Sequence, residues 1–307
     1  MRSGNWKSSI QIVAKIGLCM AIWFVGVVLL DGVAMLLMAL RSQARSLSDV
    51  DADPLYQAVM TYGGMGLLML IVWVVYRLFD RKKGWKLGLA GQYPVRRFVQ
   101  GTVMGLCMIV AACGLIWLLS GAPVIRLNNF EYAALWKGIL LFIVVALNEE
   151  LFIRGYVQGL VRHHFGIWSA VGISSLIFAI MHVFNQGMFT TPMPVINLLV
   201  AGVFFAICRE WTGSLWLPVG LHFAWNYVQG HLIGFPVSGQ RVVSVLQIQP
   251  SRVSWISGGE FGAEGSLITT VVMLCSTAYV MKIWHKQRFQ AGESIHTDHS
   301  IVGTKAI

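Results

Sequence analysis

The 307-residue sequence is 56% hydrophobic, only 12% of its residues are charged, and its mean hydropathy is +0.68. A soluble enzyme carries charges on about a quarter of its residues, while disordered, collagen-like and disulfide-rich chains need polar, Gly-periodic or Cys-rich sequences, so the composition excludes these classes. The chain instead contains continuous apolar runs of about twenty residues, long enough to cross a membrane as helices. A membrane barrel would show shorter segments of alternating polarity. We therefore predict an all-α, polytopic transmembrane helical bundle.

Eight apolar segments are predicted to span the membrane. In chain order they are approximately 12–40, 59–76, 98–120, 135–160, 167–185, 195–208, 214–233 and 266–284. They suggest three parts: three N-terminal spans with a basic cytoplasmic loop, a catalytic four-helix core, and an outer loop followed by the last span and a polar cytoplasmic tail. These parts cover residues 1–134, 135–233 and 234–307. The outer loop, at about 234–265, is long enough to gate access to a site.

The formal net charge of +10 is explained by topology. Most of the 23 Lys and Arg residues lie on one side if both termini are cytoplasmic, as the positive-inside rule expects. The densest basic cluster, at 77–86, lacks the aromatic interleaving of a nucleic-acid binder and is better suited to anionic lipid. We expect a multi-pass protein of a bacterial plasma membrane, with both termini cytoplasmic and no nucleic-acid partner. The five cysteines all lie in apolar stretches and are interpreted as packing residues.

The fourth span carries the most informative polar residues. Of the thirteen acidic residues, only Asp31, Glu149 and Glu150 lie inside predicted spans, where an unpaired carboxylate costs about 2.5–3.5 kcal/mol even on the lenient insertion scale. Glu150 and Arg154 are four residues apart and can form an ion pair on one helix face. Glu149 is rotated by about 100° from Glu150 and must face a different partner.

The fifth and seventh spans add further polar residues at helical spacing. Phe178 and His182 are four apart in the fifth, and His222 and Asn226 are four apart in the seventh. Each of these side chains alone could serve packing. Together with Glu149 they supply a base for activating water and donors for an oxyanion, which favours a catalytic site inside the membrane.

These residues resemble a known set. The pattern EExxxR at Glu149, Glu150 and Arg154, FxxxH at Phe178 and His182, and HxxxN at His222 and Asn226 is similar to that of the CPBP family of intramembrane proteases. That family includes type II CAAX prenyl endopeptidases and bacterial proteins linked to bacteriocin processing and self-immunity, often labelled Abi. The resemblance covers about residues 135–233.

The resemblance implies hydrolysis of a peptide bond in a membrane-associated protein or peptide. Glu149 and His182 would hold the attacking water, and His222 and Asn226 would stabilise the oxyanion. Glu150 and Arg154 would support the turn that presents Glu149, and Phe178 would pack against the site. Zinc remains open as a cofactor, because Glu149, His182 and His222 provide the ligand types of a catalytic zinc site without an HExxH motif. A metal-free, glutamate-activated water fits them equally.

Two other functions are compatible with the sequence. Intramembrane Glu, Arg and His could form the proton relay of a transporter, although Asn226, one turn after His222, is needed by an oxyanion hole and not by a relay. The cluster could also serve an inactive membrane scaffold.

Helix arithmetic conflicts with a shared site. Counting 1.5 Å per residue from the presumed cytoplasmic ends places Glu149 about 16 Å, His222 about 12 Å and His182 about 22 Å deep. We therefore expect the fifth helix to start later than residue 167 or to be strongly tilted.

Overall fold

A computed structural model describes residues 4–41, 47–121, 124–126, 132–248 and 254–290. Its elements are α1 (Gly4–Arg41), α2 (Leu47–Asp51), α3 (Pro54–Ala58), η1 (Val59–Gly63), α4 (Gly64–Phe79), η2 (Arg81–Lys83), α5 (Pro94–Ser120), β1 (Val124–Arg126), α6 (Tyr132–Glu150), η3 (Leu151–Val157), α7 (Gln158–Phe165), α8 (Ile167–Met181), α9 (Met193–Thr212), α10 (Trp216–Tyr227), η4 (Val228–Ile233), β2 (Leu246–Ile248), α11 (Ser254–Ser257), η5 (Gly259–Phe261), η6 (Ala263–Gly265) and α12 (Leu267–Gln290). Only β1 and β2 are strands among these residues, and they pair antiparallel.

The predicted class, an all-α membrane bundle, is confirmed. Each of the eight apolar segments lies on a helix, and the short sixth segment extends in both directions to form α9. Five helical stretches of the described chain are long and apolar enough to cross a membrane by length and composition, and α8 is a shorter apolar helix. The five are Trp6–Leu40, Pro54–Phe79, Pro94–Ser120, Met193–Thr212 and Leu267–Gln290.

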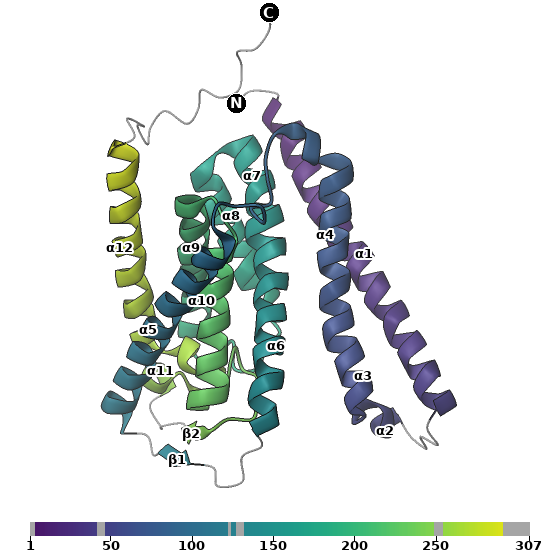
Figure 1. Ribbon diagram of the computed structural model, residues 1–307, viewed down its shortest axis with the longest axis vertical. Coiled ribbons are helices and arrows are strands. Elements are labelled where there is room, and N and C mark those ends of the chain that lie inside the picture. Colours follow the sequence, from purple (N-terminus) through teal and green to yellow (C-terminus); the bar gives the residue numbers. More distant parts are fainter. Residues whose placement is uncertain (1–3, 42–46, 122–123, 127–131, 249–253, 291–307) are drawn as a thin grey trace, which may run out of the picture.

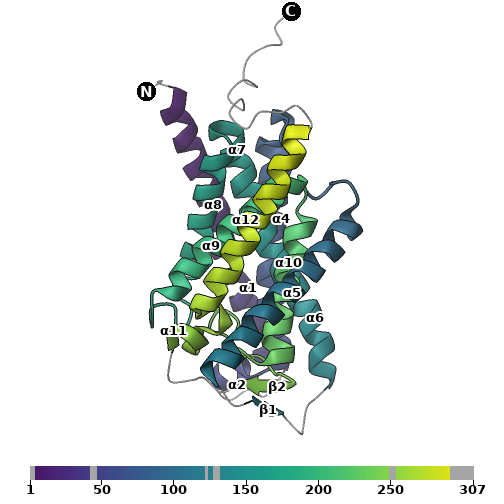
Figure 2. The same cartoon turned by 90° about the vertical axis from the view of Figure 1, so that its left-hand side faces the viewer.

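The helices form a bundle with α1 and α4 paired along one side (Figure 1). The start of α1, the basic segment η2 and the end of α12 lie at the same end of the molecule, at the top of Figure 1, while β1 and β2 lie at the opposite end. Turned by 90°, α12 lies at the front of the bundle (Figure 2), where it packs against α9 and α5. Because α1 starts and α12 ends at the same end of the molecule, the chain between them runs along the bundle an even number of times.

A buried carboxylate ties the N-terminal helix pair to the rest of the bundle. Asp80 follows α4, and its side chain is fully buried. It accepts hydrogen bonds from Lys15 Nζ of α1 at 2.5 Å, Lys83 Nζ at 3.1 Å and the hydroxyl of Tyr156 in η3 at 3.2 Å. Because Tyr156 follows Glu149 and Glu150 in the same continuous helix, α1 and α4 are linked directly to the helix that carries the acidic pair.

Glycines allow α5 and α10 to pack closely. A Cβ added at Gly101 would lie 2.0 Å from the carbonyl oxygen of Leu217, and one at Gly220 would lie 2.1 Å from that of Phe98. Both distances are far below van der Waals contact. The backbones of the two helices therefore approach as only glycine permits, which fixes the position of α10 and the side chains that it presents.

One of the two expected causes of the depth conflict, a later start of the fifth helix, is wrong, because that helix begins at residue 167. The fourth helix accounts for much of the difference, since it continues through η3 and α7 to Phe165 rather than ending near 160, which adds about 7 Å to the depth of Glu149. In addition, α10 begins within the bundle, where Leu215 packs against Gly155 of η3.

Candidate active site

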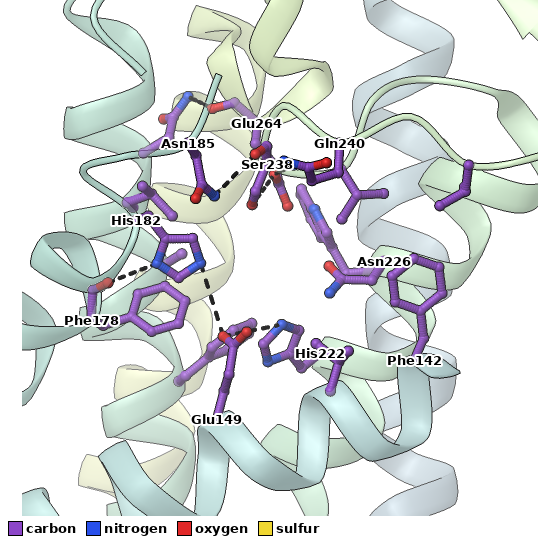
Figure 3. Close-up of a pocket in the computed structure, with 18 of the residues that line it drawn as sticks. Phe142, Glu149, Phe178, His182, Asn185, His222, Asn226, Ser238, Gln240 and Glu264 are labelled. Atoms are coloured by element: carbon purple, nitrogen blue, oxygen red, sulfur yellow. Dashed lines mark hydrogen bonds and ion pairs between the residues drawn. The ribbon is translucent and has the colours of Figure 1, made fainter. Parts of the chain in front are cut away.

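A cavity of about 260 Å³ lies among α6, α8, α9, α10 and the segment that follows η4. All four residues predicted to be catalytic line it: Glu149 from α6, His182 directly after α8, and His222 and Asn226 from α10. Figure 3 shows them pointing into one space, together with apolar side chains such as Phe142 and Phe178. The structure therefore brings together residues that are as much as 77 positions apart.

Glu149 faces both histidines. Its Oε2 atom lies 3.9 Å from Nε2 of His182 and 4.0 Å from Nε2 of His222. The same oxygen is buried and has no hydrogen-bond partner in the described part of the chain. A buried carboxylate oxygen without a partner is costly, so this position is suited to a ligand that can donate a hydrogen bond.

The other ring nitrogens fix the histidine orientations. Nδ1 of His182 lies 2.8 Å from the carbonyl oxygen of Phe178, one turn earlier. Nδ1 of His222 lies 3.0 Å from Oε1 of Glu150. Because a carbonyl and a carboxylate both accept, each Nδ1 carries the proton and donates it. In both rings this leaves Nε2 directed at the space beside Glu149.

Glu150 and Arg154 form the intrahelical ion pair that their spacing indicates. Nη1 of Arg154 lies 3.1 Å from Oε1 of Glu150, and both side chains are fully buried. The guanidinium is covered by the rings of Phe178 and Phe205, at 4.2 and 5.1 Å from its centre. Phe205, which the sequence did not single out, also stacks on the His222 ring at a centroid distance of 5.4 Å. His222 is thus held in place by Glu150 of the ion pair and by the ring of Phe205.

The sequence patterns did not identify the residues that form the cavity wall opposite Glu149. Glu264, Ser238, Gln240 and Asn185 also line the cavity, and Figure 3 shows them across it from Glu149. Burial raises the pKa of the Glu264 carboxyl above its usual value. Glu264 precedes the last span, in the outer loop, and carries no motif. Its only sequence signal is an acidic residue in a glycine-rich stretch beside an apolar segment.

The residues suggested for zinc fit in type but are widely spaced. Glu149 and the two Nε2 atoms provide one oxygen and two nitrogen donors, which zinc accepts. Donors around a tetrahedral zinc lie about 3.3 Å apart, from bond lengths of about 2.0–2.1 Å, so the separations of 3.9 and 4.0 Å would have to shorten. Among the described residues, no group of three acidic, His or Cys side chains is arranged as a ligand set as it stands.

The fold and the cavity define an integral membrane protein with a buried carboxylate–histidine site in its helical bundle. Residues 131–228 match the family model described as type II CAAX prenyl endopeptidase Rce1-like, and this match supports the resemblance to the CPBP/CAAX protease family. The matched segment includes all seven residues that the motifs single out.

A curated protein is similar to part of the chain. The chain is 32% identical over 87 residues to "Uncharacterized protein YpbD" of Bacillus subtilis (strain 168). The similarity covers 28% of this chain and 39% of that protein. The chain therefore matches well under half the length of this relative.

Proposed function

We propose that the protein is an intramembrane endopeptidase that hydrolyses a peptide bond of a membrane-associated protein or peptide. The proposal rests on one observation: Oε2 of Glu149, which has no hydrogen-bond partner among the described residues, faces Nε2 of both histidines at the wall of the cavity. The family of residues 131–228 supports the same class of activity. We further propose a bacterial plasma membrane as its location, with both termini cytoplasmic.

The orientations of the side chains support water activation by Glu149 and His182. Water placed between them donates one hydrogen to Oε2 and the other to Nε2 of His182, since both atoms accept. An oxygen lone pair then faces away from both groups and attacks the scissile carbonyl carbon. The proton of the water passes to Glu149, which later delivers it to the amide nitrogen as the carbon–nitrogen bond breaks.

His222 and Asn226 are proposed to stabilise the oxyanion. The Asn226 amide points into the cavity (Figure 3) and can donate to it. His222 donates from Nε2 in its imidazolium form, whose charge is balanced because Glu150 lies against Nδ1. Glu149, Glu150, Arg154 and the imidazolium together are neutral, which reduces the cost of burying them.

Zinc, if bound, would be held by Glu149, His182 and His222 and would polarise the scissile carbonyl as a Lewis acid. Preparing the protein in chelator and measuring bound zinc together with cleavage tests this. Full activity without zinc supports the metal-free reaction. Loss of activity that zinc restores assigns the three side chains to a metal.

The decisive variant is Glu149→Gln, which keeps the shape of the side chain and removes its basicity. We expect a loss of cleavage of about a hundredfold or more, measured in proteoliposomes with two fluorogenic probes, a farnesylated CAAX peptide and an unprenylated apolar peptide. Glu260→Gln is the matched control, because Glu260 is exposed in η5 and does not line the cavity. Cleavage unaffected by Glu149→Gln contradicts the proposal. Proton flux across the same vesicles that depends on Glu149 would instead identify a transporter.

A further inference from the structure

The cavity contains a second buried carboxylate, on the wall opposite Glu149. Glu264 of η6 is only 9% exposed and lines the cavity. Figure 3 shows it grouped with Ser238 and Gln240, which come from the segment after η4. Glu264 lies outside the region matched by the family model, and the water-activating machinery proposed above does not use it.

Glu264 is held rigidly through one of its two carboxylate oxygens. Oε2 accepts the backbone N–H of Ser238 at 2.6 Å and its hydroxyl at 2.7 Å. The backbone carbonyl of Glu264 accepts from Nδ2 of Asn197 at 2.6 Å, and the carbonyl of Ser238 accepts from Nδ2 of Asn185 at 3.0 Å. Oε1 makes no hydrogen bond with any described residue. The carboxylate is therefore fixed in place with one oxygen left for another partner.

Among the described residues, this carboxylate forms no ion pair with a Lys or Arg side chain. No Lys or Arg is among the described residues that line the cavity. The buried guanidinium of Arg154 is paired with Glu150 and covered by two phenylalanine rings. Buried carboxylates are normally paired with a cation or fully hydrogen-bonded. The cavity thus has an acidic end whose natural complement is a positive charge from outside the chain.

We propose that Glu264 is a specificity-determining residue that accepts a Lys or Arg side chain of the substrate. This proposal rests on the proposed endopeptidase function. With the scissile bond at Glu149, a substrate crossing the cavity would place a cationic side chain at one fixed position from that bond, against Oε1 of Glu264. The apolar walls between the two carboxylates would take its aliphatic stem, as long cationic side chains often require.

The test uses apolar synthetic peptides of one length. Each peptide carries Lys, Met or Glu at one variable position, and separate sets of peptides place that position at each site along the sequence. Cleavage by the full chain in proteoliposomes is measured by mass spectrometry. At one position we expect the Lys peptide to be cleaved about tenfold faster than the Met peptide, because hydrogen bonds to charged groups are the stronger class. Glu264→Gln should abolish this ratio, and Glu264→Lys should favour the Glu peptide. Glu260→Gln should behave as wild type.

A second readout does not depend on cleavage. The same peptides with a photoreactive benzophenone group are crosslinked to the Glu149→Gln protein, with and without Glu264→Gln. The proposal is supported if the Lys peptide labels the protein preferentially and Glu264→Gln removes this preference. If such labelling is seen but the wild type cuts none of the peptides, the endopeptidase function alone is contradicted. The proposal is overturned if all three peptides label the protein equally, or if Glu264→Gln leaves the Lys-to-Met ratio unchanged. It is also overturned if Glu264→Gln lowers labelling and cleavage equally for every peptide, as a purely structural residue would.

Discussion

At the scale of single residues, Glu150 organises the site with one oxygen. Its Oε1 accepts from both Arg154 and His222, while Oε2 is buried without a partner among the described residues. The Glu150 carboxylate is therefore neutralised by Arg154 of η3 and, through the same oxygen, orients the His222 ring on α10. Arg154 is the counter-charge that offsets the free-energy cost of burying this carboxylate in an apolar bundle.

Removing Arg154 should be strongly destabilising. Arg154→Met leaves the fully buried Glu150 without its cation, and breaking one side of a buried pair costs about 3–5 kcal/mol. Thermal unfolding in detergent micelles measures this as a large fall in midpoint. Arg96→Met is the matched control, because Arg96 is exposed and its removal should have little effect. The double variant Glu150→Met with Arg154→Met should recover part of the loss. If Arg154→Met were as stable as Arg96→Met, the pair would have no structural role.

Glu264 should make stability depend on pH. Its raised pKa means that the folded protein binds this proton more tightly than the unfolded chain. The stabilisation is fully present below the ordinary value of 4.5 and is lost as pH rises through the higher folded value. The neighbouring charges that oppose the shift are His182 and His222, in their protonated forms.

Comparison with Glu264→Gln tests this sign. The midpoint of wild type minus that of the variant should become more positive as pH falls, because Gln imitates the protonated acid at every pH. The variant Glu260→Gln, at an exposed position, should show no such trend. A difference that grows more negative on acidification would mean that the Glu264 pKa is lowered in the fold.

At the scale of elements, the crossing of α5 and α10 sets the position of His222 and Asn226. Gly101→Ala would place a methyl group 2.0 Å from the carbonyl oxygen of Leu217, so the helices must separate. We expect a destabilisation of about 1–3 kcal/mol and reduced peptide cleavage. Gly114→Ala is the control on the same helix, because a Cβ there meets nothing within 4 Å and alanine favours helix. Equal behaviour of the two variants would show that the contact is not tight.

The elements also show what the sequence could predict. Apolar runs located the long apolar helices of the described chain, because length and hydropathy are properties of contiguous residues. Spacing within helices predicted which polar side chains share a face, as Glu150 and Arg154 do. The level at which each helix starts could not be derived this way, since the recessed start of α10 depends on Leu215 packing against Gly155. Glu264 was missed because its burial arises from a returning loop rather than from a periodic pattern.

At the scale of the whole molecule, the shared end of α1, η2 and α12 predicts that these regions face the same compartment (Figure 1). In a cysteine-free background, Lys82→Cys and Glu260→Cys each introduce one exposed thiol, near opposite ends of the bundle. A membrane-impermeant maleimide should label Glu260→Cys on intact bacterial cells and Lys82→Cys only after lysis, because basic loops stay inside. The reverse pattern would invert the proposed orientation.

Three segments of the described chain, η1, η3 and η4, are π-helical, and the two in the core, η3 and η4, make the spacing of residues along the chain as important as their identity. η3 directly follows Glu150 and η4 follows α10, and a π turn contains more residues than the α turn that it replaces. Deleting one residue from η3 would allow α-helical winding to resume and would rotate α7 by about 100° relative to α6. Insertions and deletions within η3 would therefore misalign the fourth span with the helices packed around it. We expect length variation during evolution to be confined to the connections between spans, leaving the residue count from Glu149 to Gln158 unchanged.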